Sequence, residues 1–131
     1  SKSSSNETMH RLESGIVFQR VANAAQLDAL LSQAKQKGQP VLLDFYADWC
    51  VTCKEMELLT FSDEKVKAAL GAYLLIQVDV TKNTVEHQRI LKQYALFGPP
   101  AILLFDANGE EKISKRVIGF MKAERFLERL Q

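Results

Sequence analysis

Two cysteines, Cys50 and Cys53, are the residues whose type and spacing point most directly to chemistry. They are the only cysteines among the 131 residues, and two residues separate them. A structural zinc site takes about four ligands, but the two histidines, His10 and His87, lie far apart and lack the spacing of a zinc-binding pair. Covalent attachment of a c-type haem requires a histidine directly after the second cysteine, and Lys54 occupies that position. We therefore expect neither a metal nor a haem.

The pair is then either a redox-active dithiol or a structural feature, such as a stabilising disulfide or two buried thiols. A disulfide that closes so short a loop adds little stability by the chain-entropy account. Buried structural thiols would also not need the polar neighbours Thr52 and Lys54. A Cys-X-X-Cys pair at the start of a helix is instead typical of thiol–disulfide oxidoreductases. We favour a redox-active pair that needs no further cofactor.

The position of each cysteine predicts its role. An apolar segment precedes the pair and good helix formers follow it, so both cysteines should lie at a helix N-terminus. Backbone N–H groups and the helix dipole favour a thiolate there by roughly 0.3–2 kcal/mol. Cys50, nearer the helix start, should be the exposed nucleophile, and Cys53 the shielded thiol that resolves the mixed disulfide. Trp49 is either a core aromatic or, as we favour, a residue that faces the partner protein.

Two acidic residues could tune the pair. Asp44 interrupts the apolar segment 40–47, where an unpaired charge would be costly. We expect either an acid that is hydrogen-bonded to a loop or, as we favour, a buried carboxyl of raised pKa that exchanges protons with Cys53. Glu57 follows Cys50 by seven residues and Cys53 by four, which places it on the same helical face. A solvated surface glutamate is the alternative for Glu57.

A simple electrostatic argument predicts whether the pair donates or accepts electrons. A carboxylate about 6 Å from Cys50, at an effective dielectric constant of about 20, opposes the thiolate by roughly 2–3 kcal/mol, which raises the thiol pKa by about two. This cost equals or exceeds the stabilisation expected from the helix terminus. Because disfavouring the thiolate disfavours the reduced form, we expect the dithiol to give up electrons readily and the domain to act as a reductant.

The rest of the sequence predicts one domain that positions these residues. With 17 basic and 16 acidic residues the formal net charge is +1, which argues against a nucleic-acid partner. No apolar run approaches the roughly 18 residues that a membrane span needs. Residues 1–15 are small and polar at their start and are expected to be a flexible linker or tail, which leaves residues 16–131 as the folded domain.

Hydrophobic patterning predicts the element order β-α-β-α-(α)-β-α-β-β-α. Strands are expected over residues 16–21, 40–47, 73–80 and 101–106. The Asn108-Gly109 turn should lead into one more strand that ends near Gly119. Helix N-caps are expected at Asn23, Ser62 and Asn83, and a C-terminal stop at Gly38. This order favours an α/β sandwich around a mixed central sheet.

The residues around the cysteines are similar to a known family. The segment DFYADWCVTCK resembles the thioredoxin signature D-F-W-A-x-W-C-G-P-C-K, and the similarity extends from about Phe18 to the C-terminus. Residues 41–63 resemble in particular the C-terminal periplasmic domains of the DsbD family of inner-membrane thiol:disulfide interchange proteins. Shared features are YADWCV-x-CK, the acidic pair Glu55 and Glu57, the TFSD that follows and VIGFM near the end. The resemblance implies a thioredoxin fold, an α/β fold with a central mixed β-sheet flanked by helices on both faces.

The resemblance also implies roles for individual residues. Cys50 would be the nucleophile and Cys53 the resolving cysteine, with Asp44 as the buried acid beneath the active site. Pro100 matches the cis-proline that faces the dithiol and helps to hold the substrate backbone. Pro99 stands directly before it and has no N–H, so one hydrogen bond that other family members make to the bound chain is expected to be missing here.

The resemblance to general thioredoxins has a limit, because Val51-Thr52 replaces Gly-Pro between the cysteines. The DsbD resemblance implies a relay instead. Electrons would arrive from a membrane-embedded domain and pass by transient mixed disulfides to the N-terminal periplasmic domain of the same protein. They would end in disulfide isomerases and cytochrome c maturation factors. This chain would be a monomeric periplasmic domain of a bacterial inner-membrane protein, with the Cys50–Cys53 disulfide as its redox centre.

Two alternatives to the relay remain. One is a free-standing thioredoxin-like protein that reduces many substrates. The other is a thioredoxin fold used only for binding, in which the dithiol is incidental. The presence of both cysteines together with Trp49 and Asp44 argues against the second alternative.

Overall fold

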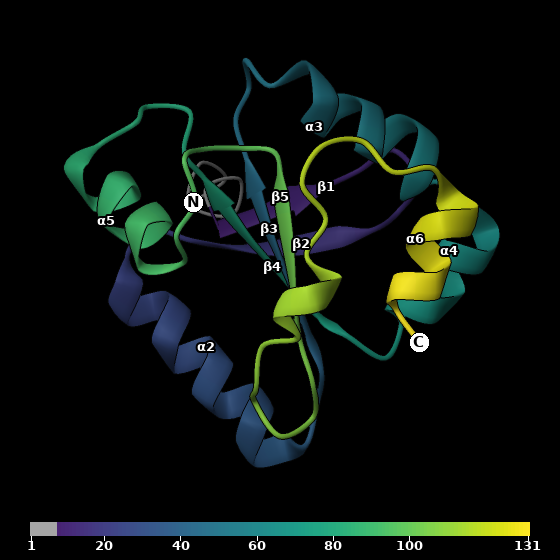
Figure 1. The fold of residues 1–131 in the computed structure, drawn as a ribbon, viewed down its shortest axis with the longest axis horizontal. Coiled ribbons are helices and arrows are strands. Elements are labelled where there is room, and N and C mark those ends of the chain that lie inside the picture. The colour runs from purple at the N-terminus through teal and green to yellow at the C-terminus, as the bar shows by residue number, and fades with distance from the viewer. Residues whose placement is uncertain (1–7) are drawn as a thin grey trace.

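The computed structural model describes residues 8–131, which form a five-stranded mixed sheet with helices on both faces (Figure 1). The strand order is β1-β2-β4-β3-β5. Strands β2, β4 and β3 run parallel, whereas β1 and β5 are antiparallel to their neighbours. The strands are β1 (Met9–Arg11), β2 (Val17–Val21), β3 (Val41–Tyr46), β4 (Leu74–Asp79) and β5 (Ala101–Phe105). The predicted α/β thioredoxin fold is thereby confirmed.

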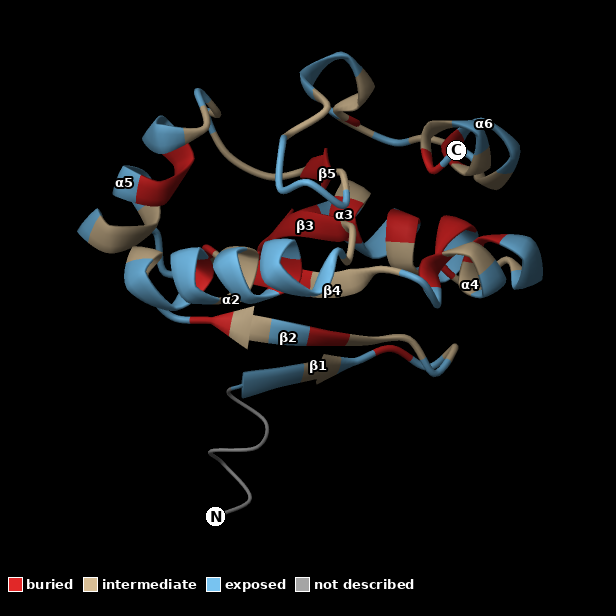
Figure 2. Ribbon diagram, turned by 90° about the horizontal axis from the view of Figure 1, so that it is seen from below, coloured by how far each residue is buried: buried red, intermediate tan, exposed pale blue. Residues whose placement is uncertain are grey.

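Helices cover the sheet on both sides. They are α2 (Ala24–Lys37), α3 (Val51–Glu55), the π-helical turn η1 (Met56–Thr60), α4 (Glu64–Leu70), α5 (Val85–Gln93), the 3-10 turn η2 (Ile113–Lys115) and α6 (Ala123–Arg129). Helices α2 and α5 pack on one face, and α3, α4 and α6 lie on the other (Figure 1). Strands β3 and β5 are buried throughout, as their apolar sequences predict (Figure 2). Within residues 8–131, no helix is both long and apolar enough to span a membrane.

The first long helix ends where the sequence predicts. The Asn23 side chain accepts a hydrogen bond from the Gln26 N–H, and the Gln26 side chain accepts one from the Ala22 N–H. These two bonds satisfy free N–H groups at the start of α2. Gly38 ends the helix at φ +65°, a left-handed conformation that glycine adopts without strain.

The folded structure begins earlier than we expected. We placed the end of the flexible tail at residue 15, but β1 pairs with β2 from Met9 opposite Gln19 to Arg11 opposite Val17, and Leu12 is buried. Residues 1–7 lie outside the described part of the chain. Strand β1 could not be predicted from hydrophobic patterning. It is a short edge strand with a single neighbour, and its side chains remain partly exposed, so it needs no apolar pattern.

Three further expectations were wrong. No regular strand follows the Asn108-Gly109 turn in the described chain, because this segment touches β5 through only two isolated bridges, at Val117 and Glu111. Asp63, not Ser62, caps α4 by accepting from two backbone N–H groups. The cap of α5 is Thr84 and not Asn83. Asn83 has φ +48°, whereas an N-cap residue needs an extended backbone.

Candidate active site

The two cysteines lie at the N-terminus of α3, as predicted, and form a disulfide with a Cα–Cα distance of 5.3 Å. Cys50 is the N-cap residue, and the backbone N–H of Cys53 donates to its Sγ at 3.1 Å. A donor aimed at this sulfur stabilises a thiolate there once the disulfide is reduced. The helix start therefore supports Cys50 as the sulfur that carries the negative charge.

Cys53 is shielded as predicted, but Cys50 is more shielded than we expected. Cys50 is 6% exposed and Cys53 4%, so the expectation of an exposed Cys50 was wrong, although its neighbours Trp49 and Val51 are largely exposed. Cys50 packs into the apolar cluster between the sheet and helices α2 and α5. Cys53 Sγ lies 3.7 Å from the carbonyl oxygen of Phe45, which can accept from the thiol in the reduced form. In the closed disulfide, Cys50 therefore offers little surface to the solvent.

Trp49 is an exposed side chain, so the alternative of a core aromatic is wrong. Its ring is held in place, because the indole N–H donates to the carbonyl oxygen of Thr81 at 3.0 Å. An amphipathic ring that is exposed and fixed suits contact with another protein. The role of Trp49 in binding a partner stays a prediction.

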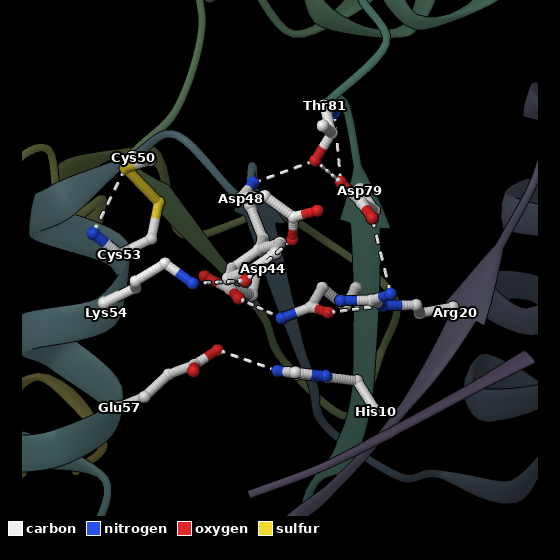
Figure 3. A network of polar contacts seen from close by, with 12 residues as sticks. His10, Arg20, Asp44, Asp48, Cys50, Cys53, Lys54, Glu57, Asp79 and Thr81 are labelled. Atoms are coloured by element: carbon white, nitrogen blue, oxygen red, sulfur yellow. Dashed lines mark hydrogen bonds and ion pairs between the residues drawn. A yellow bond between two sulfur atoms is a disulfide. The ribbon is translucent and has the colours of Figure 1, made fainter. Parts of the chain in front are cut away.

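Asp44 lies in the middle of β3 and is buried. Leu42, on the same face of the strand, belongs to the apolar cluster that contains Met56 of η1, so the Asp44 side chain points toward the face that η1 covers. Gln77 Nε2 donates to Asp44 Oδ2 at 2.8 Å (Figure 3). Burial raises the pKa of Asp44 to about 7, opposed by the Gln77 hydrogen bond, while the charge of Glu57 adds to the rise and that of Arg20 lowers it. The predicted buried carboxyl of raised pKa is present.

Glu57 lies on η1 and is held by a residue we had assigned to the tail. His10 Nε2 on β1 lies 3.1 Å from Glu57 Oε2, and the Glu57 side chain is 15% exposed (Figure 3). The alternative of a solvated surface glutamate is therefore wrong. The His10 ring also packs against Tyr46 at a centroid distance of 5.3 Å. Nothing in the sequence signals this pair, because it depends on the pairing of β1 with β2.

The π-helical turn η1 continues the helix of the dithiol and is tied to the loop before α6. Thr60 Oγ1 donates to the carbonyl oxygen of Met121 at 2.6 Å, and the Met121 N–H donates to Met56 Sδ at 3.4 Å. Phe120, next to Met121, is exposed. Single π-helical turns inserted in a helix occur frequently at functional sites.

Pro100 follows a cis peptide bond with Pro99, directly before β5. Because Ala101 is the register partner of Phe45, the two prolines lie at the end of β3 from which the cysteine loop departs. The family resemblance predicts this position for both prolines, near the dithiol. Their contact with a substrate stays a prediction.

Further polar residues of the site were missed by sequence reasoning. Lys54 Nζ donates to the Tyr46 hydroxyl at 3.2 Å, and that hydroxyl donates to Asp48 Oδ1 at 3.1 Å. Arg20 Nε donates to Gln77 Oε1 at 2.8 Å. Gln77 is fully buried, and a polar residue inside the apolar strand 73–80 was a signal that could have found it. Within residues 8–131, no group of three or more His, Cys, Asp or Glu side chains could hold a metal ion.

Comparison with known proteins first gives the class. The family model for a thioredoxin-like domain matches residues 27–131. A thioredoxin from Thermus thermophilus has a similar structure, with a TM-score of 0.63 at 24% identity over 86% of this chain and 84% of that one, which shows a shared fold. Fold and matched domain together define a thioredoxin-like domain.

More similar relatives define the particular family. The thiol:disulfide interchange protein DsbD of Ralstonia nicotianae is 50% identical over 117 residues, which are 89% of this chain and 19% of that protein. DsbD of Yersinia pestis is 54% identical over 116 residues, 88% of this chain and 19% of that protein. The oxidised C-terminal domain of Neisseria meningitidis DsbD has a TM-score of 0.72 at 41% identity, covering 83% of this chain and 94% of that domain. This chain belongs to the family of DsbD C-terminal domains. It spans about a fifth of the length of the curated relatives it matches.

Proposed function

We propose that this chain is a thiol–disulfide oxidoreductase domain that acts as a reductant. It relays electrons through Cys50 and Cys53 from a membrane-embedded domain to a periplasmic partner domain of the same protein. The observation that carries this proposal is the closed disulfide at the N-terminus of α3, directly after the strand β3 in which Asp44 is buried. The relatives named thiol:disulfide interchange proteins support the same chemistry.

In the proposed reaction, the reduced domain transfers two electrons, and the two released partner sulfurs take up protons from solvent. The Cys50 thiolate attacks a partner disulfide, which forms a mixed disulfide and releases one partner sulfur as a thiolate. Cys53 then loses its proton and attacks Cys50 Sγ. This step closes the Cys50–Cys53 disulfide and releases the second partner sulfur. The domain ends oxidised and the partner ends as a dithiol.

Asp44 serves this reaction as a proton acceptor for Cys53. A carboxyl with a pKa of about 7 holds or releases a proton at neutral pH with almost equal ease. It can therefore take the Cys53 proton during resolution and return it when the disulfide is next reduced. The carboxylates of Asp44 and Glu57 also disfavour the Cys50 thiolate, which makes the reduced domain the better electron donor.

The relatives support a proposal for the partners and the location of this chain. We assign the chain to the periplasmic side of a bacterial inner membrane, as a monomeric domain whose contacts with the other domains are transient mixed disulfides. Exposed Trp49, exposed Val51 and the cis-proline Pro100 surround the approach to Cys50 and are proposed to bind the partner backbone. No nucleic acid takes part, in line with the net charge of +1.

The test is to trap the mixed disulfide. Cys53→Ala leaves Cys50 able to attack but removes the thiol that resolves, so one covalent complex should accumulate in cells that carry the full-length protein. The partner is read by mass spectrometry after non-reducing electrophoresis. The double variant Cys50→Ala/Cys53→Ala is the control and should trap nothing.

The identity of the trapped partner decides between the alternatives. A single partner, another domain of the same protein, supports the relay. Complexes with many unrelated proteins support a general disulfide reductase. Capture of small thiols alone, or a Cys50→Ser variant that still transfers electrons, contradicts both and leaves a binding domain.

A further inference from the structure

Three polar residues form a row across the centre of the sheet. Arg20 on β2 is the register partner of Gln77 on β4, and Gln77 is the register partner of Asp44 on β3. Residues directly opposite one another in neighbouring strands point to the same face of a sheet, at strand spacings of about 4.8 Å. The side chains of Arg20, Gln77 and Asp44 therefore lie side by side on the face that α3 covers.

Hydrogen bonds along this row fix the orientation of the Gln77 amide. Arg20 Nε donates to Gln77 Oε1 at 2.8 Å, and Gln77 Nε2 donates to Asp44 Oδ2 at 2.8 Å (Figure 3). A guanidinium group has donors and no acceptor, so the amide oxygen must face Arg20. The amide nitrogen then has to face Asp44, whichever protonation state the carboxyl is in.

Arg20 is itself held on two sides. Its Nη1 lies 3.3 Å from Asp79 Oδ2, and its guanidinium lies over the Tyr46 ring at 5.3 Å from the centroid. The side chain is 17% exposed, whereas Gln77 is fully buried. A partly buried arginine with a carboxylate, an aromatic ring and an amide around it loses little freedom on making these contacts.

We propose that Arg20 is a positioning residue for the redox reaction, because it locks the Gln77 amide with its N–H₂ group toward Asp44 and so sets how tightly Asp44 holds its proton. The proposal deepens the proposed function and rests on the role given there to Asp44. Without Arg20 the buried amide is free to turn over. Its oxygen then accepts a hydrogen bond from protonated Asp44, which stabilises the neutral carboxyl in place of the carboxylate.

Several other charged or titratable groups face this region and have to be kept constant. Figure 3 labels Asp79 on β4, Cys53 and Lys54 on α3, Glu57 on η1 and His10 on β1. Tyr46 on β3 is the sixth, and its hydroxyl accepts from Lys54. Strand β5 contributes the apolar Ile102 opposite Asp44. Arg20 also lowers the pKa of Asp44 directly through its charge. A test therefore has to separate this direct charge effect from the orientation of the amide.

The experiment is an NMR pH titration of the Asp44 carboxyl carbon in the ¹³C-labelled 131-residue chain, with the disulfide closed. Arg20→Met should raise the pKa of Asp44 by about 0.7, which is a roughly fivefold tighter hold on the proton. The reason is that the Gln77 amide then accepts a hydrogen bond from the protonated carboxyl and no longer donates one to the carboxylate. Arg20→Lys keeps a cation that can only donate and should restore the original value. Arg89→Met removes an arginine exposed on α5 and is the matched control, with no change expected.

A double-mutant cycle separates the two mechanisms. In a Gln77→Met background no amide can turn over, so Arg20→Met should have a clearly smaller effect than in the parent chain. An equal rise in both backgrounds assigns the effect to the charge of Arg20 alone and overturns the proposal. No rise in the parent chain also overturns it. If Arg20→Met does not fold, Arg20→Gln takes its place and has to meet the same two criteria.

A second measurement keeps this proposal distinct from the proposed function. The rate at which reduced Cys50 reacts with iodoacetamide is recorded against pH in the same variants. If the Asp44 titration moves as expected and the Cys50 profile does not follow it, the positioning of Gln77 by Arg20 stands and the effect of Asp44 on the Cys50 thiolate in the proposed function fails. If neither moves, Arg20 has only a structural role.

Discussion

Two carboxyl groups flank the helix of the dithiol, and the structure treats them differently. Asp44 lies in a central strand, is buried, and receives its hydrogen bond from the neutral amide of Gln77. Glu57 lies on a helical turn at the edge of the site and pairs with the imidazole of His10 from an edge strand. The two carboxyls differ in the group that contacts them: Asp44 is buried with no cation in direct contact, and this burial raises its pKa to about 7.

The two carboxyls are therefore suited to different tasks, although the sequence alone suggests the same role for both. A carboxyl that titrates near neutral pH is suited to exchange a proton. A carboxyl in contact with an imidazole is suited to fasten β1 to the active-site helix. We therefore expect changes at the two sites to differ in kind as well as in size.

The largest expected effect is a gain in stability when Asp44 is neutralised. The folded protein holds the Asp44 proton up to about pH 7, whereas an unfolded aspartate releases it near pH 4, so wild-type stability falls as the pH rises between these values. Asp44→Asn avoids this loss and should stabilise the chain by about 4 kcal/mol at pH 8, and hardly at all at pH 4. Urea unfolding at both pH values measures the gain.

The control for this measurement is Asp28→Asn, an exposed position on α2 where no gain is expected at either pH. A gain of the same size at pH 4 and pH 8 would mean that ionisation of Asp44 is not its cause. The comparison between the two carboxyls would then lose its basis.

The next effect concerns the thiol. Removing one nearby carboxylate should lower the pKa of Cys50 by about one to two when the pair is reduced. Asp44→Asn should have the larger effect and Glu57→Gln the smaller one, because the Asp44 charge is buried and lacks a cation in contact. Alkylation rates of Cys50 between pH 6 and 11 measure both. If neither substitution lowers the pKa, the electrostatic argument for a reductant is wrong.

The smallest effect concerns the contact between His10 and Glu57. His10→Phe keeps a ring against Tyr46 but removes the hydrogen bond, and should cost about 0.5–1 kcal/mol of the free energy of unfolding at pH 6. His10→Gln places an amide nitrogen near the Nε2 position and should recover most of this loss. Equal losses for both variants would assign the effect to ring packing, and the pairing with Glu57 would carry no weight.

Much of the site could be predicted because local patterns encode it. The cysteines and the start of α3 follow from the segment around them, and Asp44 stands out as the one charge in an apolar strand. The cis bond before Pro100 was expected from the family resemblance alone. Each of these features depends on residues that are neighbours in the sequence.

The residues that hold the carboxyls could not be predicted in the same way. Arg20 reaches Asp44 only through the parallel pairing of β2, β4 and β3, and His10 reaches Glu57 only because β1 pairs with β2. Register between distant strands is not visible in the periodicity of any one strand. The π-helical turn η1 also has no sequence signal, since its residues are ordinary helix formers.

The two hydrogen bonds that join η1 to Met121 have a mechanical consequence. They fasten the far end of the dithiol helix to the loop that carries exposed Phe120, so we expect the helix and this loop to move together. A partner of the proposed reaction that touches this loop would therefore meet a rigid surface. We expect the disulfide to be exchanged between the two proteins with little movement of either backbone.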